Sequence, residues 1–402
     1  MTGGSGRWFY ELYRRLPRDQ FLLLAGAHPD QEEFDRTHDL RVIRVPLEMR
    51  TWAVKSFHGL REYWRAFQRI RRVIKAERIS MIHCGRSVPE GLIGLALKYW
   101  TGVPYACYIH GEGLFSALSS RELCFLTHRA LRKAEFLIAN SWNTERLLRE
   151  EWDIAPERVH VMYPGVDTDR FVPGPWSVDV RARLGWGDRT VLLTVGRLQR
   201  RKGHDRMIQA LNIIRKTVPD VLYAIVGDGE ERHYLQALTA SENLGNHVLF
   251  MGEISDEDLL ASYQQCDLFA LPNRQIGDDL EGFGMVLLEA QSCGKAVIAG
   301  DSGGTRETMR IPQTGRIVPC EGPEELARLV VEMLGNRDRL AVMGEAGRRW
   351  VVQRFDWSAL ARQAEELFLP RICGNGAACP LPEDRPDKLA ATSAPSIGHW
   401  SR

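Results

Sequence analysis

Short apolar runs alternate with longer amphipathic segments along most of the chain, and this alternation limits the possible folds more than any other feature. In the first half the runs predict strands at residues 21–26, 40–45, 81–84, 105–110, 136–139 and 159–163. In the second half they predict strands at 191–195, 221–226, 248–251, 268–271 and 296–299. Because strands separated by helical segments form βαβ units, we predict an α/β fold with two successive parallel sheets.

A segment with three prolines and little periodicity, YPGVDTDRFVPGPW at residues 163–176, separates the two sets of strands and is interpreted as an interdomain linker. The expected units are an N-terminal Rossmann-like domain at 1–165 and a C-terminal one at 166–354. A helix at 355–369 is expected to pack back on the first domain, and the tail at 370–402 is expected to be disordered. Two such domains leave a cleft at the carboxyl ends of their strands, where ligands of these sheets bind.

Composition excludes several classes of protein. The net charge of the 402 residues is +1, so any basic site is local, and no general affinity for nucleic acid is expected. No run of 18 apolar residues predicts a transmembrane helix. The eight cysteines are scattered, without a CxxC pair or a Cys/His cluster of zinc spacing, which favours reduced thiols and a cytoplasmic location.

Two cations follow the strand predicted at 191–195. In VGRLQRRKG, Arg197 and Lys202 are placed at the carboxyl end of that strand, where a guanidinium and an ammonium suit a diphosphate. The alternative is a solvated basic turn, with Arg200 and Arg201 facing water.

The stretch EGFGMVLLEAQSCG, residues 281–294, suggests a ligand-binding loop that leads into a helix. A helix that begins near Gly284 points free N–H groups at an anion, and Gly294 fits its C-terminal end. Glu281 and Glu289 are eight residues apart, so they cannot act on one atom and instead suit two separate groups of hydroxyls. A helix cap with one solvated glutamate is the simpler alternative.

The segments at 196–203, 226–231, 248–259 and 281–307, with the Thr-Gly pair at 314–315, resemble the retaining glycosyltransferases of family 4, which have the GT-B fold. The resemblance runs from about residue 3 to residue 368. The pattern of a glutamate, seven residues and a second glutamate is that family's signature and matches Glu281 and Glu289. The stretch LPNRQIGDDLEGFG at 271–284 is also similar to the phosphatidylinositol mannosyltransferase branch among the group 1 glycosyl transferases.

The resemblance implies a role for each matching residue. Arg197 and Lys202 would hold the donor diphosphate, Glu281 a hydroxyl of the transferred sugar, and Glu289 the ribose diol. His110, in YIHGEG, would lie near the donor sugar, although a histidine at a strand end can also be part of a core. The backbone is implied to contact the donor at positions that share this mode: Gly3, Gly4, Gly252, Glu253, Ile254, Phe283, Gly284 and Met285.

The implied chemistry is metal-independent and retaining, with a UDP-, GDP- or ADP-sugar as donor, no cofactor, and no side chain as general base. The Asp167–x–Asp169 pattern lies in the linker and is interpreted as structural. The sequence leaves the donor base, the sugar, the linkage and the oligomeric state open, and the acceptor is a lipid, a glycan or a polyol. Alternatives are a non-catalytic sugar-nucleotide-binding relative and an epimerase of the same fold. A nicotinamide dehydrogenase is disfavoured because no GxGxxG follows a predicted strand.

Residues 60–79 hold seven Arg/Lys against two Glu, with Tyr63, Trp64 and Phe67 interleaved. Such a helix can lie on an anionic membrane surface, which would place the protein peripherally on the inner face of the plasma membrane. An ordinary surface helix that packs on its sheet is the alternative.

Family members usually begin with a strand that leads into a Gly-Gly loop, whereas this chain begins MTGGSG. The N-terminal sheet is therefore expected to lack a central strand and to leave neighbouring backbone groups unpaired. Either Met1 is internal to a longer protein, which we favour, or the chain is a truncated relative whose activity is open.

Overall fold

The computed structural model describes residues 4–27, 31–38, 40–45, 57–118, 120–277 and 279–372. Within them the strands of the first half are β1 (Leu23–Ala25), β2 (Val42–Arg44), β3 (Ile82–Cys84), β4 (Tyr105–Ile109), β5 (Leu137–Ala139) and β6 (Val159–Val161). Those of the second half are β7 (Val191–Val195), β8 (Leu222–Val226), β9 (Val248–Gly252), β10 (Leu268–Leu271), β11 (Val297–Gly300) and β12 (Gly315–Val318). Each of the predicted strands forms, and all the strand pairs are parallel.

The helices of the first half are α1 (Gly4–Tyr13), α2 (Gln31–Thr37), α3 (Phe57–Ala76), α4 (Glu90–Thr101), α5 (Glu112–Leu118), α6 (Arg121–Lys133) and α7 (Trp142–Glu150). Those of the second half are α8 (Val178–Arg183), α9 (His204–Ile214), α10 (Arg232–Ser241), α11 (Asp256–Gln265), α12 (Met285–Ser292), α13 (Pro323–Leu334), α14 (Arg337–Arg354) and α15 (Trp357–Ile372). Three short 3-10 helices, η1 (Pro156–Arg158), η2 (Arg200–Lys202) and η3 (Thr305–Thr308), complete the described elements.

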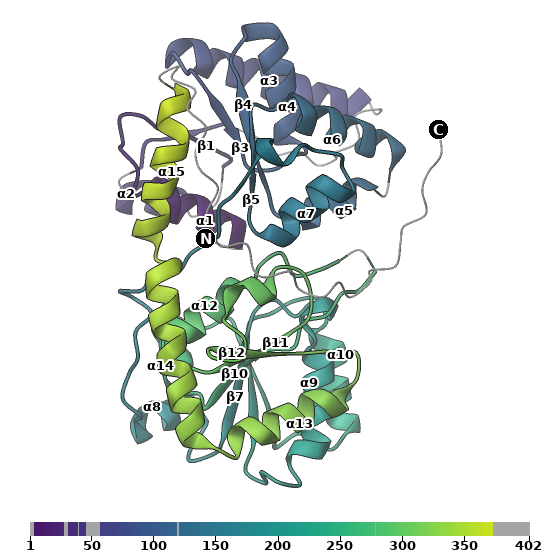
Figure 1. Cartoon of the computed structure of the whole chain (residues 1–402), viewed down its shortest axis with the longest axis vertical. Coiled ribbons are helices and arrows are strands. Elements are labelled where there is room, and N and C mark those ends of the chain that lie inside the picture. The colour runs from purple at the N-terminus through teal and green to yellow at the C-terminus, as the bar shows by residue number, and fades with distance from the viewer. Residues whose placement is uncertain are drawn as a thin grey trace.

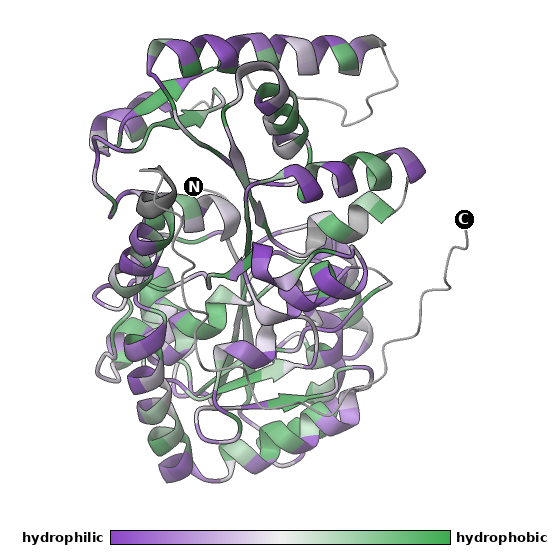
Figure 2. Ribbon diagram, turned by 45° about the horizontal axis from the view of Figure 1, so that its top comes forward, coloured by the Kyte–Doolittle hydropathy of each residue, from purple (hydrophilic) through white to green (hydrophobic). Residues whose placement is uncertain are grey.

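The second half is a six-stranded sheet in the order β12-β11-β10-β7-β8-β9, with helices on both faces. Alternation along β8 assigns its side chains to opposite cores, because Tyr223 and Ile225 belong to one hydrophobic cluster and Leu222 and Ala224 to the other. In Figure 2 the strands are largely hydrophobic, while hydrophobic and hydrophilic residues alternate along the covering helices. A sheet buried on both faces explains why these strands are continuous apolar runs in the sequence.

The described residues of the first half form two sheets rather than one: a pair β1-β2 and a set β3-β4-β5-β6. A cavity of about 1280 Å³ lies between them, lined by residues of β1 and β3 and walled in part by α1, α3 and α4. Within the described part of the chain, no strand joins β1 to β3. The interruption agrees with the expectation that this sheet lacks a central strand.

The two halves are stacked along the long axis of the molecule, and α14 and α15 run along one side of both (Figure 1). Trp357, Leu360 and Phe368 of α15 are buried in one cluster with Trp8 and Leu12 of α1. The C-terminal helix therefore ties the halves together by apolar burial, in addition to the linker.

Candidate functional site

The halves meet at the carboxyl ends of their strands, where backbones come very close. A Cβ atom at Gly282 would lie 2.7 Å from the carbonyl oxygen of His110 and 3.1 Å from Nδ2 of Asn140. His110 follows β4 and Asn140 follows β5, whereas Gly282 belongs to the loop before α12. A glycine is therefore required at 282 for this close approach, and the predicted signature loop lies at the junction of the halves.

Glu281 is the centre of a compact charged cluster in this loop. Its Oε2 atom accepts from Lys202 Nζ at 2.5 Å and from Arg201 Nη1 at 2.7 Å, and Arg201 also pairs with Asp279 at 3.0 Å. Lys202 and Glu281 are both buried. Burial alone would raise the pKa of Glu281, but the adjacent Lys202 and Arg201 charges hold it below its ordinary value. The carboxylate is thus ionised and hydrogen-bonded before any ligand is present.

The prediction that Arg201 faces water is wrong. Residues 200–202 form η2, which turns Arg200 to solvent but directs Arg201 and Lys202 to the same carboxylate. Arg197, at the carboxyl end of β7, exposes its side chain. The structure therefore brings Lys202 and Glu281 together, with Arg201 as the neighbour that the sequence did not identify.

Glu289 lies on α12 and is held from two sides. The hydroxyl of Tyr263, on α11, donates to its Oε2 atom at 2.6 Å, and Arg7, on α1, donates to Oε1 at 3.2 Å. Burial raises the pKa of Tyr263 far above its ordinary value, and the adjacent Glu289 charge adds to this shift. The Arg7 guanidinium also lies over the Phe171 ring. Both carboxylate oxygens are oriented, and one of the contacts comes from the other half of the molecule.

The start of α12 has the backbone geometry that the sequence predicted. Gly284 has φ +93° and precedes the helix, which begins at Met285. Gly294 follows its C-terminal end with φ +74°, the left-handed conformation that glycine adopts without strain. Phe283 is buried with its ring stacked on Tyr163. The free N–H groups of the first turn of α12 therefore begin directly after the loop that carries Glu281.

His110 is half-buried at the end of β4 and hydrogen-bonds through Nε2 to the carbonyl oxygen of Gly85 at 2.9 Å. Burial lowers its pKa to about 4, so the ring is neutral at pH 7 and Nε2 is the donor. The Trp8 ring packs edge-on against it. These contacts fix the orientation of the imidazole. They are expected for a histidine in a core as well as for one in a binding site.

The other predicted donor contacts lie at the ends of further elements. Gly252 ends β9 with φ +70°, next to exposed Glu253 and half-buried Ile254. Gly4 begins α1, and a Cβ atom there would lie 3.5 Å from the sulfur of Met285. The start of α1 therefore lies beside the start of α12. Gly3 falls outside the described residues.

The first aspartate of the Asp167–x–Asp169 pattern makes contacts within the linker and with the first half of the chain. The Asp167 carboxylate accepts from the backbone N–H groups of Asp169 and Arg170, at 3.2 and 3.0 Å. It also pairs with Arg14, which directly follows α1, at 3.5 Å. These contacts stabilise a turn of the linker and connect it to the first half.

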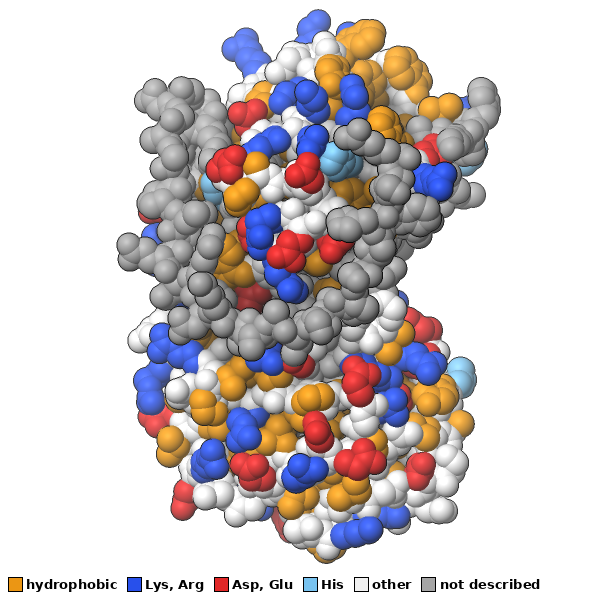
Figure 3. Space-filling model, turned by 45° about the vertical axis from the view of Figure 1, so that its right-hand side comes forward, with side chains coloured by type: hydrophobic (Ala, Val, Ile, Leu, Met, Phe, Trp, Pro, Cys, Tyr) orange, Lys and Arg blue, Asp and Glu red, His pale blue; other side chains and the backbone are white. Residues whose placement is uncertain are grey.

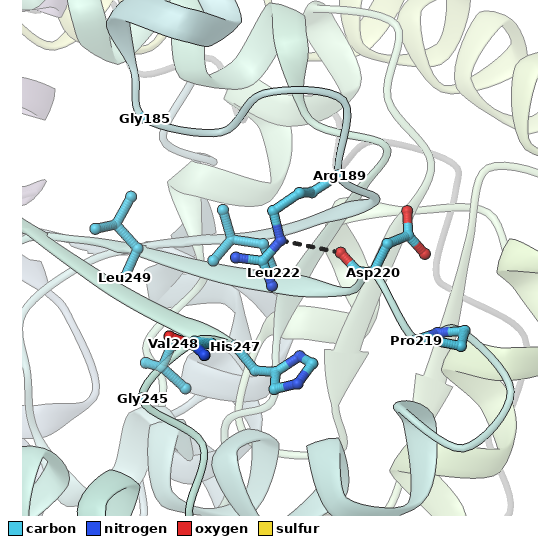
Figure 4. Close-up of a pocket in the computed structure, with 10 residues that line it drawn as sticks. Gly185, Arg189, Pro219, Asp220, Leu222, Gly245, His247, Val248 and Leu249 are labelled. Carbon is cyan, nitrogen blue, oxygen red and sulfur yellow. Dashed lines mark hydrogen bonds between the residues drawn. The ribbon is translucent and has the colours of Figure 1, made fainter.

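A second cavity, of about 490 Å³, lies at the opposite edge of the C-terminal sheet, before β7, β8 and β9 (Figure 4). Arg189 donates to the carbonyl oxygens of Asp220 and Val221, and the Asp220 carboxylate accepts from Thr190. These hydrogen bonds pair the polar groups that line the cavity with one another, and they connect the start of β7 to the start of β8. The cavity lies away from the charged loop, and we assign it no function.

The basic helix α3 combines a packed stripe with an exposed aromatic face. Phe67 and Ile74 are buried against Leu97 of α4, as the surface-helix alternative predicts. In contrast, Trp64 is 56% exposed and Trp100, on α4, is 62% exposed. Hydrophobic and basic side chains lie side by side at this end of the molecule (Figure 3). No helix within the described ranges has the length and apolar character to cross a bilayer.

Comparison with known proteins agrees with these features. Residues 2–170 match the sequence profile of Glycosyltransferase Family 4, and residues 179–350 match that of Glycosyl transferases group 1. A GDP-mannose-dependent alpha-(1-6)-phosphatidylinositol monomannoside mannosyltransferase of Mycolicibacterium smegmatis is 41% identical over 214 residues, which are 52% of this chain and 55% of that protein. The match thus spans about half the length of that relative.

A longer match is to the GDP-mannose-dependent monoacylated alpha-(1-6)-phosphatidylinositol monomannoside mannosyltransferase of Corynebacterium glutamicum. It is 31% identical over 378 residues, 91% of this chain and 94% of that protein. The crystal structure of Anabaena HepE in complex with UDP superposes with a TM-score of 0.75 at 22% identity, covering 91% of this chain and 96% of that one. The fold, the charged loop between two parallel-sheet halves and the full-length relative together place this chain in glycosyltransferase family 4, with the GT-B fold.

Proposed function

We propose that the protein transfers a hexosyl group from a nucleotide-diphosphate sugar to a lipid acceptor, with retention of the anomeric configuration. The observation that carries this proposal is the buried Lys202–Glu281 pair, at 2.5 Å, in the loop before the N-terminus of α12. Mannose from GDP-mannose is the first candidate, because the relatives of M. smegmatis and C. glutamicum are named for that donor.

Charge explains how this site would hold the donor. A diphosphate lying between Lys202 and the first turn of α12 meets an ammonium and the free N–H groups of a helix N-terminus. Arg201 remains on Glu281, which keeps that carboxylate ionised and available to accept from a sugar hydroxyl. Exposed Arg197 can turn to the phosphates from β7. The ribose diol would then donate to Glu289, which Tyr263 already orients.

The chemical step proposed is a displacement on one face of the sugar. The bond between C1 and the phosphate oxygen breaks as the acceptor oxygen bonds to C1, and the acceptor proton passes to the departing phosphate oxygen. Lys202, Arg197 and the α12 N-terminus stabilise the negative charge that develops on the nucleoside diphosphate. The step needs neither a metal ion nor a side-chain general base.

The acceptor is proposed to be a glycolipid reached from an anionic membrane surface. Support comes from α3 and α4, where Trp64 stacks on Phe67, and the Arg71 guanidinium lies over the Trp100 ring. Exposed aromatic rings beside arginines suit the interface between water and lipid headgroups.

Comparing a nucleotide with inorganic diphosphate tests the donor assignments separately. The protein is titrated calorimetrically with GDP, UDP, ADP and pyrophosphate, first as wild type and then as Glu289→Ala. We expect Glu289→Ala to weaken binding of the preferred nucleotide about tenfold or more, because the ribose loses its acceptor, while leaving pyrophosphate affinity unchanged. An equal loss for both ligands, or no loss for either, would contradict the ribose role.

A further inference from the structure

Glu307, in the C-terminal half, reaches across to the N-terminal half and caps one of its helices. It lies on η3, directly after the Gly303–Gly304 pair. Its Oε2 atom accepts from the backbone N–H of Trp142 at 2.7 Å, and its Oε1 atom accepts from that of Asn143 at 2.9 Å. These are the first two residues of α7, so a carboxylate of one half satisfies the free N–H groups of a helix in the other.

The contact lies where backbones of the two halves come close together. A Cβ atom at Gly304 would be 2.5 Å from the carbonyl oxygen of Gly282 and 3.1 Å from Cβ of Ser141. Ser141 is the N-cap of α7 and accepts from the N–H of Thr144 at 3.1 Å. The side chain of Glu307 and the backbone of Gly304 therefore fix the same helix end from adjacent positions.

The start of α7 is connected through Asn140 and His110 to the loop that carries Glu281. Asn140 precedes the N-cap, and its Nδ2 atom donates to the carbonyl oxygen of His110 at 3.3 Å. Gly282 packs on that same carbonyl and is the neighbour of Glu281. Holding α7 against η3 thus sets the separation between the end of β4 and the loop that carries Glu281.

We propose that Glu307 is a positioning residue for sugar transfer: by capping α7 across the junction, it fixes the N-terminal half against the C-terminal half, which carries the proposed donor site. The proposal rests on the proposed function for its effect on turnover, whereas the contact itself can be tested without activity. Glu307 touches no group assigned to donor binding, so the C-terminal half should bind nucleotide even when Glu307 is replaced.

The surroundings of Glu307 support this role. Burial raises the pKa of Glu307 to about 7, against the opposing effects of the Asn143 and Trp142 N–H groups, the Tyr163 hydroxyl and the Arg146 charge. The N–H groups, the hydroxyl and the guanidinium around this carboxyl group all belong to residues 142–163, on the N-terminal side of the junction.

The test compares Glu307→Ala with Glu307→Gln, which keeps one acceptor oxygen, and with Glu345→Gln, an exposed glutamate of α14, as the matched control. Hydrogen exchange followed by NMR reports the amides of Trp142 and Asn143. We expect Glu307→Ala to speed their exchange about tenfold or more, with a smaller effect for Gln and none for the control. Unchanged exchange at both amides would overturn the proposal.

Turnover provides the second readout. With donor saturating, Glu307→Ala should lower kcat/KM for the acceptor about tenfold, change the nucleotide Kd less than about twofold, and be partly rescued in Glu307→Gln. A matching loss of nucleotide affinity, or full transfer despite fast exchange at α7, would contradict a positioning role. If the wild-type protein transfers no sugar, the proposed function fails, and the exchange experiment alone then decides whether Glu307 holds the two halves together.

Discussion

Glu281 shares one carboxylate oxygen between Lys202 and Arg201, so the two cations stabilise its charge together but are not equivalent. Lys202 Nζ is a compact charge that can rotate toward a phosphate, whereas Arg201 is also fixed by Asp279 at 3.0 Å. We infer that Lys202 serves the donor and Arg201 keeps Glu281 in place.

Three single substitutions separate these roles. Lys202→Ala should lower transfer about a hundredfold or more, because a charge that stabilises the leaving group is lost. Arg201→Ala should lower it less and should also lower the melting temperature, since Asp279 and Glu281 lose a partner. Arg200→Ala, an exposed neighbour on the same turn, is the control and should leave both unchanged. Near-normal turnover of Lys202→Ala, measured as initial rates, would remove the diphosphate assignment.

The buried carboxyl of Glu307 makes stability depend on pH. Burial raises its folded-state pKa from 4.5 to about 7, which corresponds to roughly 3 kcal/mol at most. A raised pKa means that the folded state binds the proton more tightly than the unfolded state. The stabilising contribution is therefore complete below pH 4.5 and is lost as pH rises toward 7. Thermal melts from pH 4.5 to 8 should show wild type losing stability relative to Glu307→Gln over this window; parallel curves would contradict it.

At this scale the sequence predicted residues inside motifs and missed those brought together by folding. Glu281 and Glu289 could be singled out because a fixed spacing within one segment carries their pattern, and Lys202 because it follows a predicted strand in another segment; their roles stay predictions. Arg7 and Tyr263 both contact Glu289, yet they lie 282 and 26 residues away in the sequence. No local periodicity marks such partners, since only the packing of α1 and α11 on α12 creates the contacts.

Among the elements, strands were predicted well wherever both faces of a sheet are covered. The runs at 191–195 and 268–271 coincide with β7 and β10 because burial on both faces requires continuous apolar residues. β12, Gly315–Val318, was not predicted: it is short, begins with glycine and contains Arg316. It lies at the edge of its sheet, where one neighbour suffices to pair it and a charged side chain can reach water.

For α3 the sequence left a membrane-surface helix and an ordinary packed helix as alternatives, and it did not show which residues pack and which are exposed. Its apolar stripe packs on α4, as an ordinary surface helix requires, and its other side presents Trp64 and arginines to solvent. Periodicity alone does not reveal that Trp100 of α4 extends this exposed face, because Trp64 and Trp100 are brought near each other by packing of both rings on Phe67.

If α3 docks on lipid, its exposed charges should govern the affinity. Replacing Arg65, Arg71 and Arg72 by Gln should weaken binding to vesicles containing phosphatidylinositol about tenfold or more at low salt, since each basic residue near an anionic surface contributes about 1 kcal/mol. The control variant has Gln in place of Arg328, Arg337 and Arg339, which are exposed on the C-terminal half. Equal loss for both triple variants in a sedimentation assay would show only a net-charge effect and would contradict specific docking.

At the scale of the whole molecule, the halves are joined by contacts of three kinds. α15 buries Trp357 with Trp8 of α1, Arg7 pairs with Glu289, and Glu307 caps α7. The apolar cluster reaches Met285 at the start of α12, and the two carboxylate contacts lie on α12 itself and at the start of α7. A ligand that binds Glu289 must therefore share it with Arg7 or displace it, so occupancy of the site and the relation of the halves are coupled.

Sugar transfer itself can be measured with radiolabelled mannose supplied as GDP-mannose and an extracted phosphatidylinositol mannoside as acceptor, with UDP-glucose as the competing donor. We expect label in the lipid fraction, attached with the anomeric configuration of the donor, in wild type and Arg200→Ala but not in Lys202→Ala. Failure of a folded, nucleotide-binding protein to label any lipid, glycan or polyol acceptor from any sugar nucleotide would contradict the proposed function.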